Sequence, residues 1–415
     1  MIGVSKRASL SGHLTGTVMT FCMCAFLLIA FRDGKTDIPC LIMAGAIPAA
    51  VWIANRLLPK LFPIDEILFS LTCFLCSLGV LVLYVTKPAV ATTQLITCGI
   101  GMVAMIVCIF LVRSMRTWKH FSLLAFPVSL LLLVLPLLIG RETNGARNWI
   151  SLGFVHFQPS EIVKPALVVI LSCFMSRRRL LPWLLFSILC LGLLMLQRDL
   201  GTALVYFGTT LLLYWASGGN TAGALVGLAG GVGAGFAGYR MFSHVRVRFA
   251  IWRNPWADYD GTGYQLVQSL VAIASGGFFG VGLGLGDPTV IPVYESDFIF
   301  SVICEQFGVI FGLCVLLVYI ALVARGVSVA MAARKSVTGL IAMGCTIMLA
   351  LQTFVIIGGV IKLIPLTGVT LPFVSYGGTS LISSMCLSGL IQGVASLNRD
   401  ALDEDAAIAR THGAQ

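Results

Sequence analysis

Five ionisable side chains stand where the surrounding sequence is apolar, and they are the first candidates for chemistry. They are Glu161, Lys164, Asp199, Asp297 and Glu305. A charged side chain near the middle of a bilayer costs about 2.5–3.5 kcal/mol on insertion scales, so one that is kept there usually faces a cavity, a partner or a ligand. A carboxylate in such a place can act as a base or bind a cation.

Each of these residues also has a purely structural interpretation. Glu161 and Lys164 lie three residues apart on one face of a predicted helix, so they can form an ion pair that is either functional or only stabilising. Asp199 and Asp297 each stand at the start of an apolar run, where the helix dipole favours an acid. For Asp199 this structural interpretation is the simpler one. Glu305 lies two turns further along the run that Asp297 begins.

The composition is that of a membrane protein. Of 415 residues, 58% are hydrophobic and 11% are charged, whereas a soluble domain has about a quarter charged residues. The net charge of +10 comes from short basic clusters between apolar runs. This is the positive-inside pattern, which makes nucleic acid an improbable partner and membrane lipids the surroundings.

Twelve apolar runs are long enough to cross about 30 Å of hydrocarbon, which takes about 17–25 residues. They are 14–31, 38–55, 67–86, 88–112, 121–140, 160–176, 181–197, 200–217, 221–239, 297–324, 336–361 and 375–398. The weakest are 38–55, 160–176 and 181–197, which are short or contain proline or charge. If the runs alternate in direction, the basic clusters share one side, which predicts that both termini are cytoplasmic.

The opposite side carries two long connections, 141–159 and 240–296. The second contains four arginines, Arg240, Arg246, Arg248 and Arg253, which is the wrong charge for an external loop. They could bind an anionic ligand outside, or they could extend to lipid headgroups. The glycines of 276–286 follow an apolar stretch and are not part of a βαβ unit, so a nucleotide-binding site is improbable here. They favour a segment that dips into the membrane and turns back.

Several short motifs occur in a fixed order from about residue 65 to the end of the last run. They are Gly145–Ile150, Gln158–Glu161 with Lys164, Asp199–Ala203, Asn254–Trp256, Gly263–Gln265, the glycines of 276–286, Ser296–Phe300 with Glu305, and Pro365–Gly378. In order and spacing, these motifs resemble the SEDS family (shape, elongation, division and sporulation), whose members include RodA, FtsW and SpoVE.

The resemblance implies an all-α polytopic membrane protein with a ten-helix core and a large extracellular loop, 240–296. Residues 1–64 would form an N-terminal extension with two further transmembrane helices, for about twelve in total. Residues 65–398 would be the core and 399–415 a polar cytoplasmic tail. Members polymerise lipid II on the outer face of the bacterial cytoplasmic membrane, and they work with a class B penicillin-binding protein, the transpeptidase that crosslinks the glycan.

The resemblance also assigns roles to individual residues. Asp297 matches the essential aspartate of the family. The positions that line the central cavity or its rim, and that would bind substrate, are Arg147, Trp149, Glu161, Lys164, Arg248 and Ser375. Asp199 and Glu305 would be structural or would line the cavity. The chain departs from the family pattern at Asn148, where many relatives have a second arginine, and at Gln306, where they have a second glutamate.

Lipid II has an anomeric carbon that carries a diphosphate leaving group. Asp297 would remove the proton of the acceptor hydroxyl, and Arg147 with Arg248 would stabilise the departing diphosphate. Asp297 could instead bind a divalent cation such as Mg²⁺ or Mn²⁺, the one cofactor that the sequence suggests. One carboxylate does not decide between these roles.

Two other functions use the same features. A lipid II flippase would need the charged cavity but no chemistry, and a non-catalytic scaffold for the transpeptidase would make no demand on Asp297. The biological role also stays open. Asn254–Trp256 is similar to division proteins, whereas the short link from Gly286 to Pro292 and the extra N-terminal helices are closer to elongation proteins; a sporulation role is equally open.

Overall fold

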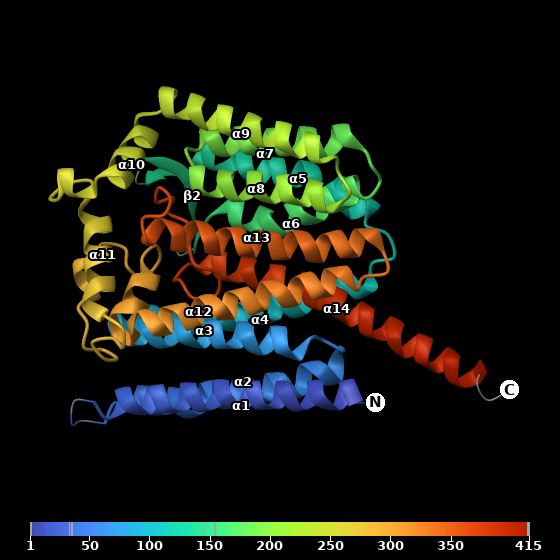
Figure 1. Ribbon diagram of the computed structural model, residues 1–415, viewed down its shortest axis with the longest axis horizontal. Coiled ribbons are helices and arrows are strands. Elements are labelled where there is room, and N and C mark those ends of the chain that lie inside the picture. The colour runs from blue at the N-terminus through green and yellow to red at the C-terminus, as the bar shows by residue number, and fades with distance from the viewer. Residues whose placement is uncertain (1, 33, 35, 144, 153–154, 413–415) are drawn as a thin grey trace.

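The structure is a computed structural model that describes residues 2–32, 34, 36–143, 145–152 and 155–412. Nearly all of these residues are helical (Figure 1). The α-helices are α1 (Ile2–Ala30), α2 (Ile38–Leu61), α3 (Glu66–Thr86), α4 (Pro88–Ser114), α5 (Lys119–Ile139), α6 (Pro159–Met175), α7 (Leu180–Leu196), α8 (Leu200–Ala216), α9 (Thr221–Met241), α10 (Ser243–Arg253), α11 (Tyr264–Gly276), α12 (Ile299–Met331), α13 (Ser336–Val360) and α14 (Gly378–His412). Two short 3₁₀ helices are η1 (Pro255–Asp258) and η2 (Pro288–Val290).

Each of the twelve predicted runs coincides with a helix. Within the described residues, nine helices are long and apolar enough to cross a membrane, which makes the chain a multi-pass membrane protein. The helices α6, α7 and α8 have 17 residues each, at the lower limit for a span. The predicted polar tail, 399–415, is helical as far as His412, because α14 continues to that residue.

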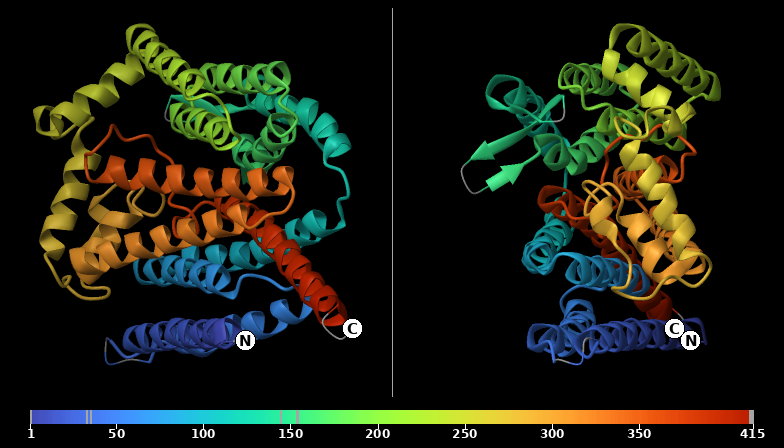
Figure 2. Two further views of the ribbon diagram at one scale, coloured as in Figure 1. Left: turned by 45° about the vertical axis from the view of Figure 1, so that its right-hand side comes forward. Right: turned by 90° about the vertical axis from the view of Figure 1, so that its left-hand side faces the viewer.

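A small β-sheet occupies the connection 141–159, where the all-α prediction had none. Its strands are β1 (Arg141–Thr143), β2 (Ala146–Leu152) and β3 (Val155–Phe157), paired antiparallel in the order β1-β2-β3. In β2, Ile150 is buried between the exposed residues Trp149 and Ser151, which is the alternation of a strand with one covered face. Gly145, at φ 79°, turns the chain from β1 to β2. The sheet projects from one side of the bundle (Figure 2).

The centre of the bundle consists of α3, α13 and α14. In their most apolar windows, 89%, 72% and 83% of the residues are buried, compared with 6% in α9. Helix α14 packs along α4, and α13 packs against α8 and α12. A side chain at Gly389 of α14 would lie 2.6 Å from the carbonyl oxygen of Met105. The glycine therefore lets the two backbones approach closely, as small residues do between membrane helices.

The ends of the bundle differ in charge. Both described ends of the chain lie at one end, and α10 and α11 lie at the other (Figure 1). The links from α4 to α5, from α6 to α7 and from α12 to α13 carry most of the basic clusters and lie at the end with the termini. The clusters thus share one end, as the sequence predicted; which side of a membrane this end faces stays a prediction.

Helix α12 is interrupted at Gly308, which has φ 86° and ψ 165°. The interruption frees backbone groups that the glycine-rich segment then satisfies. Val281 N–H donates to Glu305 O (2.9 Å), Gly282 N–H donates to Gln306 O (3.1 Å), and Val309 N–H donates to Gly277 O (2.9 Å). Irregular backbone in a membrane protein requires such partners. The glycine run is therefore a tight turn fitted into a broken helix.

The N-terminal hairpin of α1 and α2 packs on α3. Tyr84 of α3 donates to Asp37 Oδ2 (2.8 Å). Arg32 Nη1 donates to the carbonyl oxygen of Gly284 (2.7 Å), in the glycine-rich turn. The hairpin is thus attached to both the central helices and this turn, while the division of the chain at residue 64 stays a prediction.

Candidate active site

Asp297 lies just before α12, at the end of the bundle with α10 and α11. The helix begins at Ile299, two residues later than the predicted span, and its N-cap residue is Phe298. Asp297 is attached through its backbone, because its N–H donates to Val293 O (3.2 Å). The N-cap residue Phe298 forms no side-chain cap hydrogen bond, and within the described residues no backbone N–H donates to the Asp297 carboxylate. Asp297 is therefore not a helix cap, while its interpretation as an acid favoured by the helix dipole stays a prediction.

The surroundings of Asp297 raise its pKa to about 6. Burial is the largest cause, and the Glu295 carboxylate adds to it. The Ser296 hydroxyl and the Arg248 guanidinium act in the opposite direction. Burial lowers the pKa of Arg248, whereas Asp297 and Asp199 raise it. A carboxylate with a pKa near neutrality and a neighbouring cation is suited to proton transfer.

The α13–α14 loop, residues 361–377, lies against Asp297. Gly368 has φ 72°, and a Cβ atom there would lie 3.5 Å from Asp297 Oδ2. Arg248 Nη1 donates to Leu366 O (2.9 Å), which ties α10 to the same loop. Ser375 Oγ donates to Ser296 O (2.5 Å) and accepts from Leu371 N–H (2.9 Å). The loop thus brings together three predicted site residues: Asp297, Arg248 and Ser375.

A buried chain of polar contacts continues from this loop into the bundle. Gln352 of α13 donates through Nε2 to Thr370 O (2.9 Å) and accepts through Oε1 from Lys164 Nζ (2.9 Å). Lys164 Nζ also lies 2.8 Å from the Glu161 carboxylate. The predicted ion pair between Glu161 and Lys164 is therefore confirmed, and Gln352 connects it to the loop beside Asp297.

Asp199 is the N-cap of α8, where its Oδ1 accepts from Thr202 N–H (3.1 Å). Its Oδ2 accepts from Gln158 Nε2 (2.7 Å), Asn148 Nδ2 (3.2 Å) and Ser160 Oγ (3.4 Å). The predicted helix-start acid is thus also the residue that ties β2 and the start of α6 to α8. Asn148, one of the two departures from the family pattern, is one of the side chains that donate a hydrogen bond to Asp199.

Arg147 and Trp149 are on β2 and are separate from this chain of contacts. The Nε atom of Arg147 lies 3.6 Å from Glu142 Oε2, and both side chains are about half exposed. Trp149 is exposed as well. Both residues therefore stand at an outer rim, and within the described residues neither forms a hydrogen bond to Asp297 or Arg248.

Glu305 lies under the glycine-rich turn and not beside Asp297. Its Oε1 accepts from Asp287 N–H (3.3 Å), and a side chain at Gly286 would collide with it. Its other oxygen and both polar atoms of the Gln306 amide are buried and have no hydrogen-bond partner among the described residues. The second departure from the family pattern, Gln306, is thus an interior amide next to the break in α12.

A divalent cation would find few protein ligands here. Among the described residues, no group of three or more histidine, cysteine, aspartate or glutamate side chains could hold a metal ion. Near Asp297 the second carboxylate is Glu295, which pairs with Lys87 (3.2 Å). A cation at Asp297 would therefore depend on one carboxylate together with water and substrate phosphate, which is a mode known for Mg²⁺.

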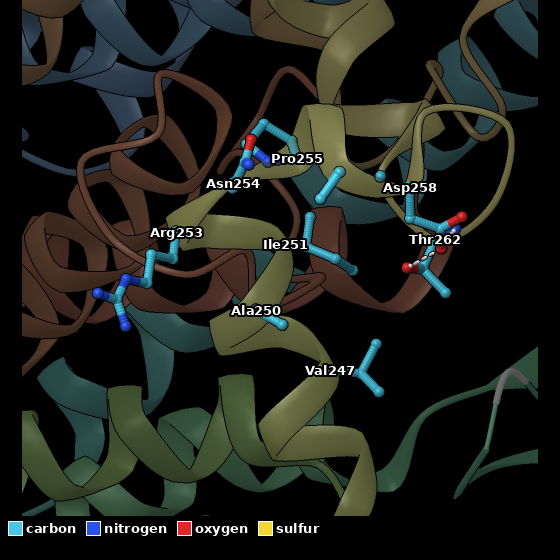
Figure 3. Close-up of a pocket in the computed structure, with 10 residues that line it drawn as sticks. Val247, Ala250, Ile251, Arg253, Asn254, Pro255, Asp258 and Thr262 are labelled. Atoms are coloured by element: carbon cyan, nitrogen blue, oxygen red, sulfur yellow. Dashed lines mark hydrogen bonds between the residues drawn. The ribbon is translucent and has the colours of Figure 1, made fainter.

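A cavity of about 540 Å³ lies along α10 and η1 on the way to α11 (Figure 3). It is lined mainly by apolar groups such as Val247 and Ile251, with Asp258 bonded to Thr262 at one side. None of the predicted site residues lines it. The arginines of this segment are therefore not gathered in one pocket: Arg253 lines this cavity, while Arg248 is turned to the α13–α14 loop.

Sequence reasoning missed Gln352, Thr370 and Ser296 as partners in the site. Gln352 had a usable signal, because it is a polar side chain within the charge-free run 336–361, and buried polar groups need partners. Thr370 and Ser296 accept the hydrogen bonds from Gln352 and Ser375 through their backbone oxygens, and such contacts leave no mark on the sequence.

Comparison with known proteins shows the family. The sequence profile of the FtsW, RodA and SpoVE proteins, described as cell cycle proteins, matches residues 65–400. Stage V sporulation protein E of Bacillus subtilis is 34% identical over 366 residues, which cover 81% of this chain and 98% of that protein. Peptidoglycan glycosyltransferase RodA of Mycobacterium tuberculosis is 32% identical over 324 residues, 72% of this chain and 69% of that protein. The probable peptidoglycan glycosyltransferase FtsW of Coxiella burnetii is 35% identical over 308 residues, 68% and 80% of the two chains.

Solved structures agree with the sequences. One from work described as structural coordination of polymerization and crosslinking by a peptidoglycan synthase complex has a TM-score of 0.68 at 30% identity, over 81% of this chain and 98% of that chain. The crystal structure of the rod shape determining protein RodA of Thermus thermophilus has a TM-score of 0.60 at 30% identity, over 82% of this chain and 99% of that chain. With its motifs, its helices and its relatives in agreement, the chain belongs to the FtsW/RodA/SpoVE family of SEDS proteins.

Proposed function

We propose that this chain is a peptidoglycan glycosyltransferase that polymerises lipid II, with Asp297 as the general base. The class of reaction is supported by the relatives that are named peptidoglycan glycosyltransferase, which cover about 70% of the chain. The observation that carries the role of Asp297 is that the residue is only partly buried, while burial of its carboxyl group raises the pKa to about 6 beside the Arg248 cation.

In the proposed reaction, the acceptor hydroxyl oxygen attacks the anomeric carbon of the donor sugar. The bond between that carbon and the diphosphate oxygen breaks, and the diphosphate leaves with the bonding electrons. Asp297 takes the proton of the hydroxyl group. Since its pKa is about 6, most of the carboxylate is ionised at pH 7 but is still basic enough to accept a proton, and such catalysis contributes about 10²–10⁴-fold in rate.

Arg248 is proposed to stabilise the departing diphosphate. One of its N–H groups is held by Leu366 O, and a guanidinium has five in a planar fork, so others can bind phosphate oxygens. Arg147 is proposed as a second ligand at the rim. Its exposed pair with Glu142 is of a kind that contributes little to stability, so it can be exchanged for an anionic substrate. Trp149 is proposed to contact substrate at the same rim.

Glu161, Lys164 and Ser375 are proposed to position the α13–α14 loop. Their burial and their contacts through Gln352 and Ser296 support this role more directly than the substrate contact predicted from the sequence. Asp199 is proposed to fix the rim to α8, and Glu305 to support the glycine-rich turn. If a divalent cation binds, Asp297 would hold it and it would neutralise diphosphate charge.

We further propose that both termini are cytoplasmic and that 240–296 is external. The basic clusters at the terminal end of the bundle support this orientation, and it places Asp297 on the outer face of the cytoplasmic membrane. A class B penicillin-binding protein is the proposed partner. The support is the similarity to the structure whose description names a peptidoglycan synthase complex.

The test is polymerisation of fluorescent lipid II by the purified full chain in detergent, analysed by gel. The parent should form glycan strands, which a flippase or a scaffold would not. Asp297→Asn should remain folded and lose at least about 10²-fold in rate. Asp260→Asn, an exposed acid at the same end, is the matched control and should retain the parental rate. Parental activity of a folded Asp297→Asn variant would refute the assignment.

An added chelator separates the two roles of Asp297. Persistence of the parental product supports the general base, and loss of product that Mg²⁺ or Mn²⁺ restores would show that the reaction needs a divalent cation, for which Asp297 is the proposed ligand. If the parent makes no product but moves lipid II across vesicles, the polymerase proposal fails in favour of the flippase.

A further inference from the structure

A second cavity is formed at the links from α4 to α5, from α6 to α7 and from α12 to α13. These links lie at the end of the bundle that carries both termini, opposite to α10 and α11 (Figure 1). The volume of the cavity is about 570 Å³. Four separate parts of the chain enclose it: the links from α4 to α5, from α6 to α7 and from α12 to α13, and the side of α14 at Leu397. Nothing in the reaction proposed above uses this cavity.

The cavity is lined by four cations, Arg113, Arg116, Arg177 and Lys335. Arg113 is paired with Asp400 (2.8 Å). In the described parts of the chain, no carboxylate lies within ion-pair distance of the other three. A positive-inside bias explains basic residues at this end, but it does not require that three links direct them to one cavity.

The start of α13 adds to the positive potential of the cavity. Lys335 is the N-cap residue, and its side chain forms no cap hydrogen bond. The next residues, Ser336, Val337 and Thr338, also line the cavity, and the backbone N–H groups of a first helical turn have no partner within the helix. A 25-residue helix therefore presents its positive end to a space already surrounded by cations, which favours an anion.

The rest of the lining is largely apolar, with Thr117 and Ser176 as its polar members. Val112, Met115, Leu397 and the buried Trp118 form the apolar part. A cavity with a cationic rim and an apolar wall, at the ends of membrane-spanning helices, matches the headgroup and glycerol region of a lipid better than a free ion. Basic pockets between helices on this side of membrane proteins bind anionic headgroups.

We propose that this cavity is a binding site for the phosphate headgroup of an anionic phospholipid. Arg116, Arg177, Lys335 and the first turn of α13 contact the phosphate, while Trp118 and Leu397 contact the glycerol and the first carbons of the chains. The site is separate from the polymerisation site and does not depend on the function proposed for it.

The experiment measures binding of fluorescent phosphatidylglycerol to the purified full chain in detergent, with phosphatidylcholine and inorganic phosphate as competitors. Phosphatidylcholine should not displace the probe, and inorganic phosphate should do so only at a large excess. The variant Arg116→Gln/Arg177→Gln/Lys335→Gln should bind at least about tenfold more weakly, since each cation near a lipid surface contributes about fivefold. Displacement by equimolar inorganic phosphate would overturn the assignment to a lipid.

The matched control is Lys119→Gln/Arg178→Gln/Arg179→Gln, which removes the same charge from the same end without altering the lining. It should weaken binding by less than about twofold, and equal losses in the two triple variants would overturn the site. Two single changes give independent readings. Arg116→Gln should weaken binding about fivefold, and Asp400→Asn, which frees Arg113, should tighten it; an unchanged affinity in both would also overturn the site.

Discussion

The buried pair of Glu161 and Lys164 permits a prediction with a magnitude. The side chains are 6% and 1% exposed, and Lys164 Nζ lies 2.8 Å from Glu161 and 2.9 Å from Gln352 Oε1. Glu161→Ala leaves a buried ammonium with one neutral acceptor. Breaking such a pair costs about 3–5 kcal/mol, so we expect this loss in the free energy of unfolding, measured by denaturant titration in mixed micelles.

Removing both charges should cost much less. In Glu161→Gln/Lys164→Met the side-chain volumes are nearly kept and no charge is left unpaired, and such replacements are often close to neutral. The double variant should therefore be more stable than Glu161→Ala, and it should lose less free energy of unfolding than Glu161→Gln and Lys164→Met lose in sum when measured singly. This comparison does not require an estimate of any single contact.

An exposed pair provides the control. Asp405 pairs with Arg334, and both side chains are more than half exposed. Asp405→Ala should cost less than about 1 kcal/mol, because surface ion pairs contribute little. Glu161→Ala could lower the free energy of unfolding no more than Asp405→Ala, or the losses from the two changes at 161 and 164 could simply add. Either result would mean that the buried pair does not interact as argued, and that it does not support the α13–α14 loop.

Three further predictions concern other parts of the molecule. Because the pKa of Asp297 is raised to about 6, the carboxylate is protonated and the base is lost as pH falls through that value. The kcat/KM for lipid II should therefore fall about tenfold per pH unit below about pH 5.5. A flat profile down to pH 4.5 would exclude this titration. Gly308→Ala should lower the free energy of unfolding by about 1–3 kcal/mol, because a Cβ atom at φ 86° would lie 2.2 Å from Phe278 O. The control is Gly99→Ala, which places its Cβ atom in open space on α4 and should be neutral or slightly stabilising. A cysteine at position 260 of a cysteine-free chain should react with an impermeant reagent in intact cells; reaction only after lysis would reverse the orientation.

The helices could be predicted from the sequence because a bilayer demands long apolar runs. Each of the twelve runs became a helix, including the weak ones, since a membrane leaves few alternatives for unpaired backbone groups. Contacts between near neighbours were also accessible. Glu161 and Lys164 are three residues apart, and Asp199 caps the helix that directly follows it.

Long-range partners could not be predicted in this way. Lys164 and Gln352 are 188 residues apart, and no periodicity relates them. The three-residue strands β1 and β3 are too short to show an alternation. The break at Gly308 was missed because a lone glycine in an apolar run is compatible with a continuous helix. What marks it is the glycine-rich turn that satisfies its backbone, and that turn comes from a different part of the chain.

The acids of the apolar regions differ in what already occupies their oxygen atoms. Asp199 accepts from a backbone N–H and from three side chains, and Glu161 is engaged by Lys164. Glu305 is covered by the glycine-rich turn, so its free oxygen faces the interior. Within the described residues, no backbone N–H donates to the carboxylate of Asp297, which is only half-buried. A base must be able to take a proton from an outside molecule, and among these acids Asp297 is the one that is not fully buried and whose pKa of about 6 permits the transfer. The polar chain from Glu161 to the α13–α14 loop then has a mechanical purpose, since it fixes the segment against which that carboxylate is held.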